Sequence, residues 1–166
     1  MSDIVAPPDS TLTQTPTATS LNEFVGKHIK DICGCEFQDD SFNHCAHFVS
    51  HAMGFHFGYT CKHQTGKGKV GANIRVHELF KMCPEVGEWE NLKAVSCLVF
   101  VTAASNVNLE TNVMVNVPRK HVGIYLQGTI WHYSNSKQKV VTQTPEEFSH
   151  HYPGKDIALF YGTFPP

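Results

Sequence analysis

The sequence contains no apolar run that approaches the roughly 20 residues needed to span a bilayer. Its first residues also lack the basic region and apolar core of a secretory signal. Neither sign of charge is in large excess, since the chain has 13 Lys and Arg and 15 Asp and Glu, for a formal net charge of -2. We therefore expect synthesis in the cytoplasm, and neither a membrane nor a nucleic acid as partner.

The six cysteines are too scattered for a small disulfide scaffold. They stand at positions 33, 35, 45, 61, 83 and 97. Reduced thiols are the default expectation, and disulfides stay open if the protein works outside the cell that makes it. Histidine, by contrast, is abundant, because 11 residues of this type occur in the chain. They would add positive charge below about pH 6.

A chain of 166 residues with 41% apolar composition is long enough for one domain with a hydrophobic core and short for two. Residues 1–20 are rich in Pro, Ser and Thr and hold few apolar anchors, which predicts a flexible tail. Residues 21–166 are expected to form a single domain.

Hydrophobic periodicity predicts helices first and strands afterwards. Helices are expected over 21–32, 43–53, 73–82 and 145–151. Strands are expected over 95–103, 113–117, 121–126, 129–134 and 157–164. The segment 55–72 has no convincing period and is interpreted as a loop near the site. Helices followed by an antiparallel sheet indicate the α+β class.

Cys45 stands in the run Asn43-His44-Cys45-Ala46-His47-Phe48-Val49, where Asn43 is a candidate helix cap. A thiol at the start of a helix is favoured as thiolate by the exposed N–H groups and the helix dipole. Its own N–H, or that of a neighbour, can also donate to an oxyanion. Cys45 is therefore the candidate nucleophile, and the alternative is a buried apolar cysteine.

Two histidines lie on the predicted hairpin about eighty residues later. If Gln127-Gly128 is a two-residue turn, Leu126 faces Thr129 and Gly123 faces His132. His121 and His132 are then diagonal neighbours on one face, within reach of each other. A slip of one residue would instead place Asn135 across from His121, so Asn135 is the alternative third residue. The expected site is Cys45 with His121 as base and His132 as the group that orients it.

These residues resemble the NlpC-type, papain-like cysteine peptidase and amidase superfamily. The likeness covers roughly residues 40–135, and it is strongest in His121-Val122-Gly123-Ile124-Tyr125-Leu126 followed by a short turn and Trp131-His132. The resemblance implies N-terminal helices packed on an antiparallel sheet. It also implies a cysteine hydrolase that cleaves an amide bond in peptidoglycan stem peptides.

Absence of a secretory signal from such an enzyme suggests an antibacterial effector similar to the type VI amidase effectors. That resemblance implies delivery to the periplasm of a target cell, with an immunity protein and a component of the secretion machine as partners. A cytoplasmic location is the alternative.

Two further functions compete for the same residues. The run Cys45-Ala46-His47-Phe48-Val49 also resembles the lecithin:retinol acyltransferase-like enzymes, which would imply a thiol acyltransferase or hydrolase acting on another acyl substrate. The non-catalytic alternative is a binding module that uses the same groove.

Cysteines and histidines that lie close in sequence make a structural zinc site conceivable. The residues are Cys33, Cys35, His44, His47, His51, Cys61 and His63. Because no Cys-x-x-Cys pair occurs, a solvated, histidine-rich helix face is the preferred interpretation. The expected site has neither metal nor cofactor.

Overall fold

The apolar strand expected at 95–103 forms the centre of a sheet. In the computed structural model, which describes residues 15–34, 37–61 and 71–166, β2 (Ser96–Ala103) is buried along most of its length. β2 pairs antiparallel with β5 (Lys120–Leu126) on one side and with β8 (Ile157–Gly162) on the other. A strand covered on both faces needs the continuous apolar run that these residues provide.

In the described part of the chain, six strands form this sheet, in the order β1-β8-β2-β5-β6-β7. Its remaining members are β1 (Val86–Glu88), β6 (Thr129–Ser134) and β7 (Lys139–Gln143). β3 (Val107–Asn108) and β4 (Val113–Met114) make a separate two-stranded sheet. All pairs between these strands are antiparallel. The chain therefore belongs to the α+β class, as the sequence predicts.

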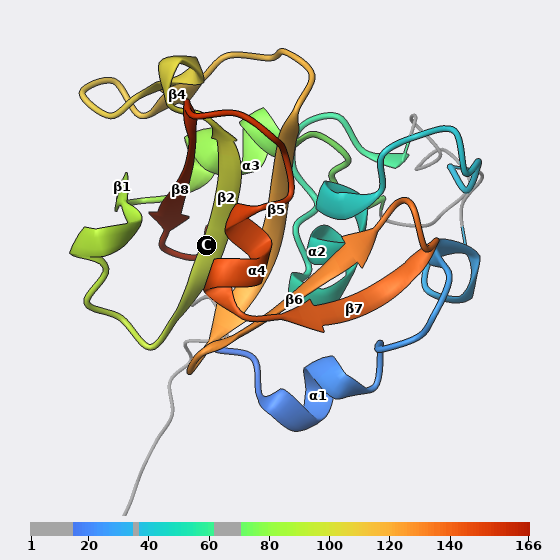
Figure 1. The fold of residues 1–166 in the computed structure, drawn as a ribbon. Coiled ribbons are helices and arrows are strands. Elements are labelled where there is room, and N and C mark those ends of the chain that lie inside the picture. The colour runs from blue at the N-terminus through green and yellow to red at the C-terminus, as the bar shows by residue number, and fades with distance from the viewer. Residues whose placement is uncertain (1–14, 35–36, 62–70) are drawn as a thin grey trace, which may run out of the picture.

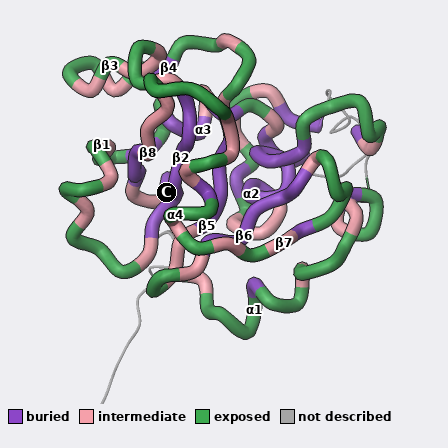
Figure 2. Tube along the Cα trace, in the orientation of Figure 1, coloured by how far each residue is buried: buried purple, intermediate pink, exposed green. Residues whose placement is uncertain are grey.

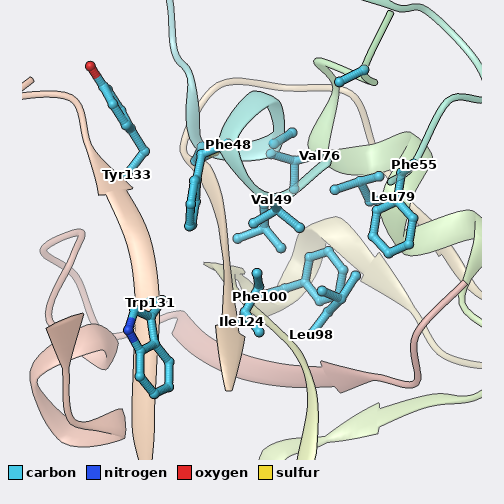
Figure 3. Packing of buried hydrophobic residues seen from close by; sticks show 14 of the residues in the cluster. Phe48, Val49, Phe55, Val76, Leu79, Leu98, Phe100, Ile124, Trp131 and Tyr133 are labelled. Atoms are coloured by element: carbon cyan, nitrogen blue, oxygen red, sulfur yellow. The ribbon is translucent and has the colours of Figure 1, made fainter. Parts of the chain in front are cut away.

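Helices lie on both faces of the sheet (Figure 1). α2 (Cys45–Met53) and α3 (Val76–Met82) cover one face, and α4 (Pro145–Ser149) covers the other. Figure 3 shows Phe48 and Val49 of α2 directed at Phe100 and Ile124 of the sheet. Burial is concentrated in α2, β2, β5 and β6, while the peripheral turns are exposed (Figure 2). The larger core thus lies beneath α2 and α3, and it fixes α2 against β5 and β6.

Local signals set the ends of two predicted helices. Thr144 and Glu147 form a reciprocal capping box at the start of α4. Gly54, with φ 79°, takes the left-handed conformation that closes α2. Gln127 and Gly128 both have positive φ, as the two-residue turn between β5 and β6 requires. These elements match their predictions.

The helix predicted over 21–32 is wrong as a single element. The structure has α1 (Ala18–Asn22), capped by Thr17, and a separate 3-10 turn, η2 (Ile29–Asp31). Between them Gly26, with φ 86°, donates its N–H to the Val140 carbonyl at 2.9 Å. The chain turns there because the left-handed glycine lets it pair with β7. Of the predicted tail, residues 1–14 lie outside the described part.

Other predictions were incomplete. The strand over 113–117 shrinks to the two residues of β4, whereas β1 and β7 were not predicted. Both missed strands are short and partly polar, so they carry little period-two signal. Of the predicted loop 55–72, residues 62–70 lie outside the described part. No helix among the described residues is both long and apolar enough to cross a bilayer.

Candidate active site

The hairpin of β5 and β6 adopts the predicted register. Leu126 pairs with Thr129, and Ile124 pairs with Trp131. Nearer the site, β5 stays paired with β2 and β6 stays paired with β7. The pairing of β5 with β6 ends at Ile124 and Trp131, so the predicted pair of Gly123 with His132 is not part of the ladder. This leaves an opening in the ladder at the strand ends that carry His121 and His132.

The two predicted histidines lie in contact within this opening. His121 Nε2 and His132 Nδ1 are 2.9 Å apart, and His132 Nε2 is 2.7 Å from Gln143 Oε1. An amide oxygen accepts only, so His132 donates from Nε2 and its Nδ1 must accept from His121 Nε2–H. His121 Nδ1 is then an unprotonated acceptor. This Nδ1 is buried, and no described residue gives it a hydrogen bond.

The N-terminus of α2 lies at the same opening. Asn135, directly after β6, accepts the N–H of His44 at 2.9 Å. On the other side, the backbone N–H of Val122 in β5 faces the sulfur of Cys45. Cys45 therefore sits beside the residue that follows His121. The alternative third residue, Asn135, contacts the start of α2, whereas His132 contacts His121.

Burial decides the protonation of Cys45. The side chain is 1% exposed, and desolvation raises the pKa of its thiol to about 11. The N–H groups of Val122 and Ala46 act in the opposite direction without overcoming burial. The expectation that the helix start favours the thiolate is wrong for this structure, because burial outweighs the dipole. Cys45 is a neutral thiol near pH 7.

The backbone N–H of Cys45, which the sequence suggested as a donor to an oxyanion, is already hydrogen-bonded to Asn43. The N–H of Cys45 donates to Asn43 Oδ1 at 2.9 Å, and Asn135 Nδ2 donates to the same oxygen at 2.9 Å. The cap predicted at Asn43 is wrong by one residue, because the N-cap of α2 is His44, whose side chain makes no capping bond. Asn43 stands one residue earlier and accepts the N–H of Cys45. An oxyanion would have to displace Asn43 or use another N–H of the first helical turn.

The segment that follows α4 covers the thiol and the histidines. The ring of His151 stacks on that of His121, with centroids 3.9 Å apart and planes 12° apart. Burial raises the pKa of Tyr152, and the nearby Cys45 adds to this rise. Sequence reasoning missed both residues, because no pattern connects them to a site thirty residues earlier.

A pocket of about 440 Å³ reaches this covered site from the side of β6 and β7. It is lined by His132, Gln143 and His151 together with polar residues of the turn after β6. Lys137 supplies a cation at its wall. The pocket borders His132 but not His121, and its lining suits a polar ligand better than a lipid chain.

Gln143 was also missed by sequence reasoning. It is the last residue of β7, and His132 pairs with Val141 two residues before it. Gln143 therefore lies diagonally to His132 on the same face. Predicting β7 from the turn at 135–138 would have revealed it.

The helix face predicted to be solvated is instead buried. His44, the residue before α2, and His47 within it are almost fully buried, and His51 is partly covered. Phe37 packs against both His44 and His47. A solvated face is therefore wrong for this helix.

Acidification from pH 7 to pH 4 is expected to destabilise the fold by about 3 kcal/mol through His132 alone. Burial lowers the pKa of His132 from 6.5 to about 4, and that of His121 lies well below its usual value. The unfolded chain therefore takes up these protons first. The stability is present above pH 6.5 and is lost as the pH falls through about 4.

Groups facing the pair do not reverse this sign. His151 and Lys137 are basic, and Gln143 is neutral. Urea unfolding at both pH values would measure the effect, with His132→Gln as the control. This variant should lose less stability than the wild type over the same range. Equal losses in both proteins would contradict the prediction.

Comparison of the chain with protein-family models, with curated proteins and with solved structures finds no match.

Proposed function

We propose that the protein is a cysteine hydrolase that cleaves an amide bond, with Cys45 as nucleophile, His121 as general base and His132 as the positioning residue. The observation that carries the proposal is the chain from Gln143 through His132 to His121. This chain of hydrogen bonds leaves His121 Nδ1 as a buried acceptor. Cys45, the first residue of α2, lies at the same opening between β5 and β6. A nucleophile, its base and a group that orients the base are the parts that thiol catalysis requires.

The reaction would start from neutral groups. Cys45 Sγ attacks the amide carbonyl carbon while its proton passes to His121 Nδ1. His132 holds the other nitrogen of the imidazolium through Nδ1. The carbon–nitrogen bond then breaks, and the leaving amine takes the proton from His121. Water attacks the thioester and gives a proton back through His121, which releases the acid and restores the thiol.

Substrate access would require the segment with His151 and Tyr152 to move, because Cys45 and His121 are both covered. Closure over a bound peptide would exclude water from the amide. The pocket beside His132 would hold a polar portion of the substrate, and Lys137 would meet a carboxylate there. Peptidoglycan stem peptides carry both amides and free carboxylates, and they are the substrate class we propose.

Digestion of purified peptidoglycan by the wild type and by Cys45→Ala tests this function. We expect new stem-peptide fragments with the wild type only, and their masses would identify the bond. If neither protein cleaves while an electrophilic thiol probe still labels Cys45, the substrate is another acyl compound, as in the acyltransferase-like alternative. If Cys45 does not react either, the binding module replaces the enzyme.

A further inference from the structure

Four sulfur and nitrogen ligand atoms converge on the side of α2 away from the proposed nucleophile. They belong to Cys33, His47, His51 and Cys61, and all lie within 4.8 Å of one another. His47 and His51 come from consecutive turns of α2, and Cys33 follows η2. Cys61 is the last described residue of the segment after α2. Residues far apart in sequence are therefore brought to one point by the fold.

The three separations among Cys33 Sγ, Cys61 Sγ and His47 Nε2 are close to the edges of a tetrahedron around one ion, and His51 lies within 4.8 Å of all three atoms. Cys33 Sγ and Cys61 Sγ are 3.9 Å apart, and they lie 3.2 and 3.4 Å from His47 Nε2. With zinc–sulfur bonds of about 2.3 Å and zinc–nitrogen bonds of about 2.0 Å, tetrahedral geometry requires about 3.8 Å between sulfurs and about 3.5 Å between sulfur and nitrogen. The sulfur atoms are too far apart for the roughly 2.05 Å of a disulfide.

Hydrogen bonds fix the His47 ring in the tautomer that a metal needs. His44 Nε2 lies 2.7 Å from the Asp39 carbonyl oxygen and must donate to it. His44 Nδ1 is then an acceptor, and it lies 3.2 Å from His47 Nδ1, which donates. His47 Nε2 is left without a proton, facing the two sulfurs. Such a second layer of partners is characteristic of histidine ligands.

His51 provides a second observation that points to a ligand. His51 belongs to the cluster, and its Nε2 atom is buried without a hydrogen bond from any described residue. A buried nitrogen left unsatisfied costs free energy that a bound ion would recover. The amide N–H of Ala72 donates to Cys61 Sγ at 3.2 Å, and this donor would also stabilise a metal-bound thiolate.

We propose that Cys33, His47, His51 and Cys61 bind one zinc ion as a closed structural site. Two thiolates and two imidazoles make up a donor set that selects zinc and provides all four tetrahedral positions. No position remains for water, which separates this site from catalytic zinc. The ion would join the residue after η2 and the segment after α2 to the middle of α2. It would thereby hold the helix whose first residue is Cys45.

Zinc analysis of the full chain after dialysis tests the proposal without any measure of activity. We expect about one zinc ion per chain in the wild type. Cobalt added to the chelated, reduced protein should produce the visible bands of tetrahedral cobalt and the near-ultraviolet band of thiolate ligation. Loss of zinc should lower the Tm by at least about 10 °C, because binding of a structural ion contributes to folding.

Variants locate the ion. Cys61→Ser and His51→Ala should lose it, while Cys97→Ser, a buried cysteine on β2, should keep it. Cys45→Ala should also keep it, which separates this site from the proposed active site. His51→Cys should retain cobalt with a stronger thiolate band and covers the case in which the other variants do not fold. The proposal would be overturned if the wild type held less than about 0.1 zinc ion per chain and showed no cobalt bands. It would also be overturned by a Cys33–Cys61 disulfide in place of the zinc site, or by loss of zinc from Cys45→Ala.

Discussion

Cys45→Ala is expected to lower turnover of the cleaved substrate by at least about 10⁴-fold. The sulfur is the atom that forms the acyl intermediate, and an alanine methyl group cannot replace it. The rate of fragment release, followed by mass spectrometry on the substrate identified by digestion, measures the loss. A smaller effect would mean that the chain from Gln143 to His121 activates water directly, or that another group is the nucleophile.

The fold of Cys45→Ala should remain intact. The change removes a single sulfur from a site where the thiol makes only weak contacts with neighbouring N–H groups, so we expect a cost of about 1 kcal/mol. Cys97→Ala is the matched control, since Cys97 is equally buried and lies on β2. This control should keep the activity of the wild type. Retention by Cys45→Ala of more than about a tenth of that activity would refute the assignment of the nucleophile.

Gly123→Ala is expected to destabilise the protein by about 3 kcal/mol and to lower the Tm by about 10 °C. A Cβ at this position would lie 2.7 Å from Ile130 Cγ2 and 3.0 Å from the Trp131 carbonyl oxygen. It would also lie 3.1 Å from His132 Cβ. The backbone carbonyl cannot yield without disturbing the β5–β6 ladder, so the strain would reach His132 and its contact with His121.

Thermal unfolding of Gly123→Ala, Ile130→Ala and the double variant measures this effect. Ile130→Ala removes the methyl group that the new Cβ would meet, at the cost of a cavity. The double variant should therefore lose less stability than the two single variants added together. Strict additivity, or a Tm of Gly123→Ala equal to that of the wild type, would show that the gap beside Gly123 is not required.

Local sequence was sufficient for the hairpin that holds the histidines. Gln127 and Gly128 favour a tight turn, and alternation along both strands sets which side chains share a face. His121 and His132 were assigned to one face by that alternation, although their contact lies beyond the paired part of the hairpin. The start of α2 at Cys45 and its end at Gly54 are local features of the same kind.

The residues that contact this histidine pair from other segments were not predictable from local sequence patterns. Gln143 enters the site on a short polar strand, and His151 enters on the segment after α4. Neither position has a periodicity that would mark it. The protonation of Cys45 also depends on the tertiary fold, since burial of the side chain raises its pKa.

The cluster of Cys33, His47, His51 and Cys61 most clearly separates what local sequence predicts from what the tertiary structure decides. The spacing of His47 and His51 along one helix was visible in the sequence, but their partners Cys33 and Cys61 lie on either side of α2 in irregular segments. The sequence by itself determined the helix, the hairpin and the residue types that carry chemistry, because these depend on near neighbours. Only the tertiary structure decided which of those residues meet and which lose contact with water, because both depend on the packing of segments far apart in the chain.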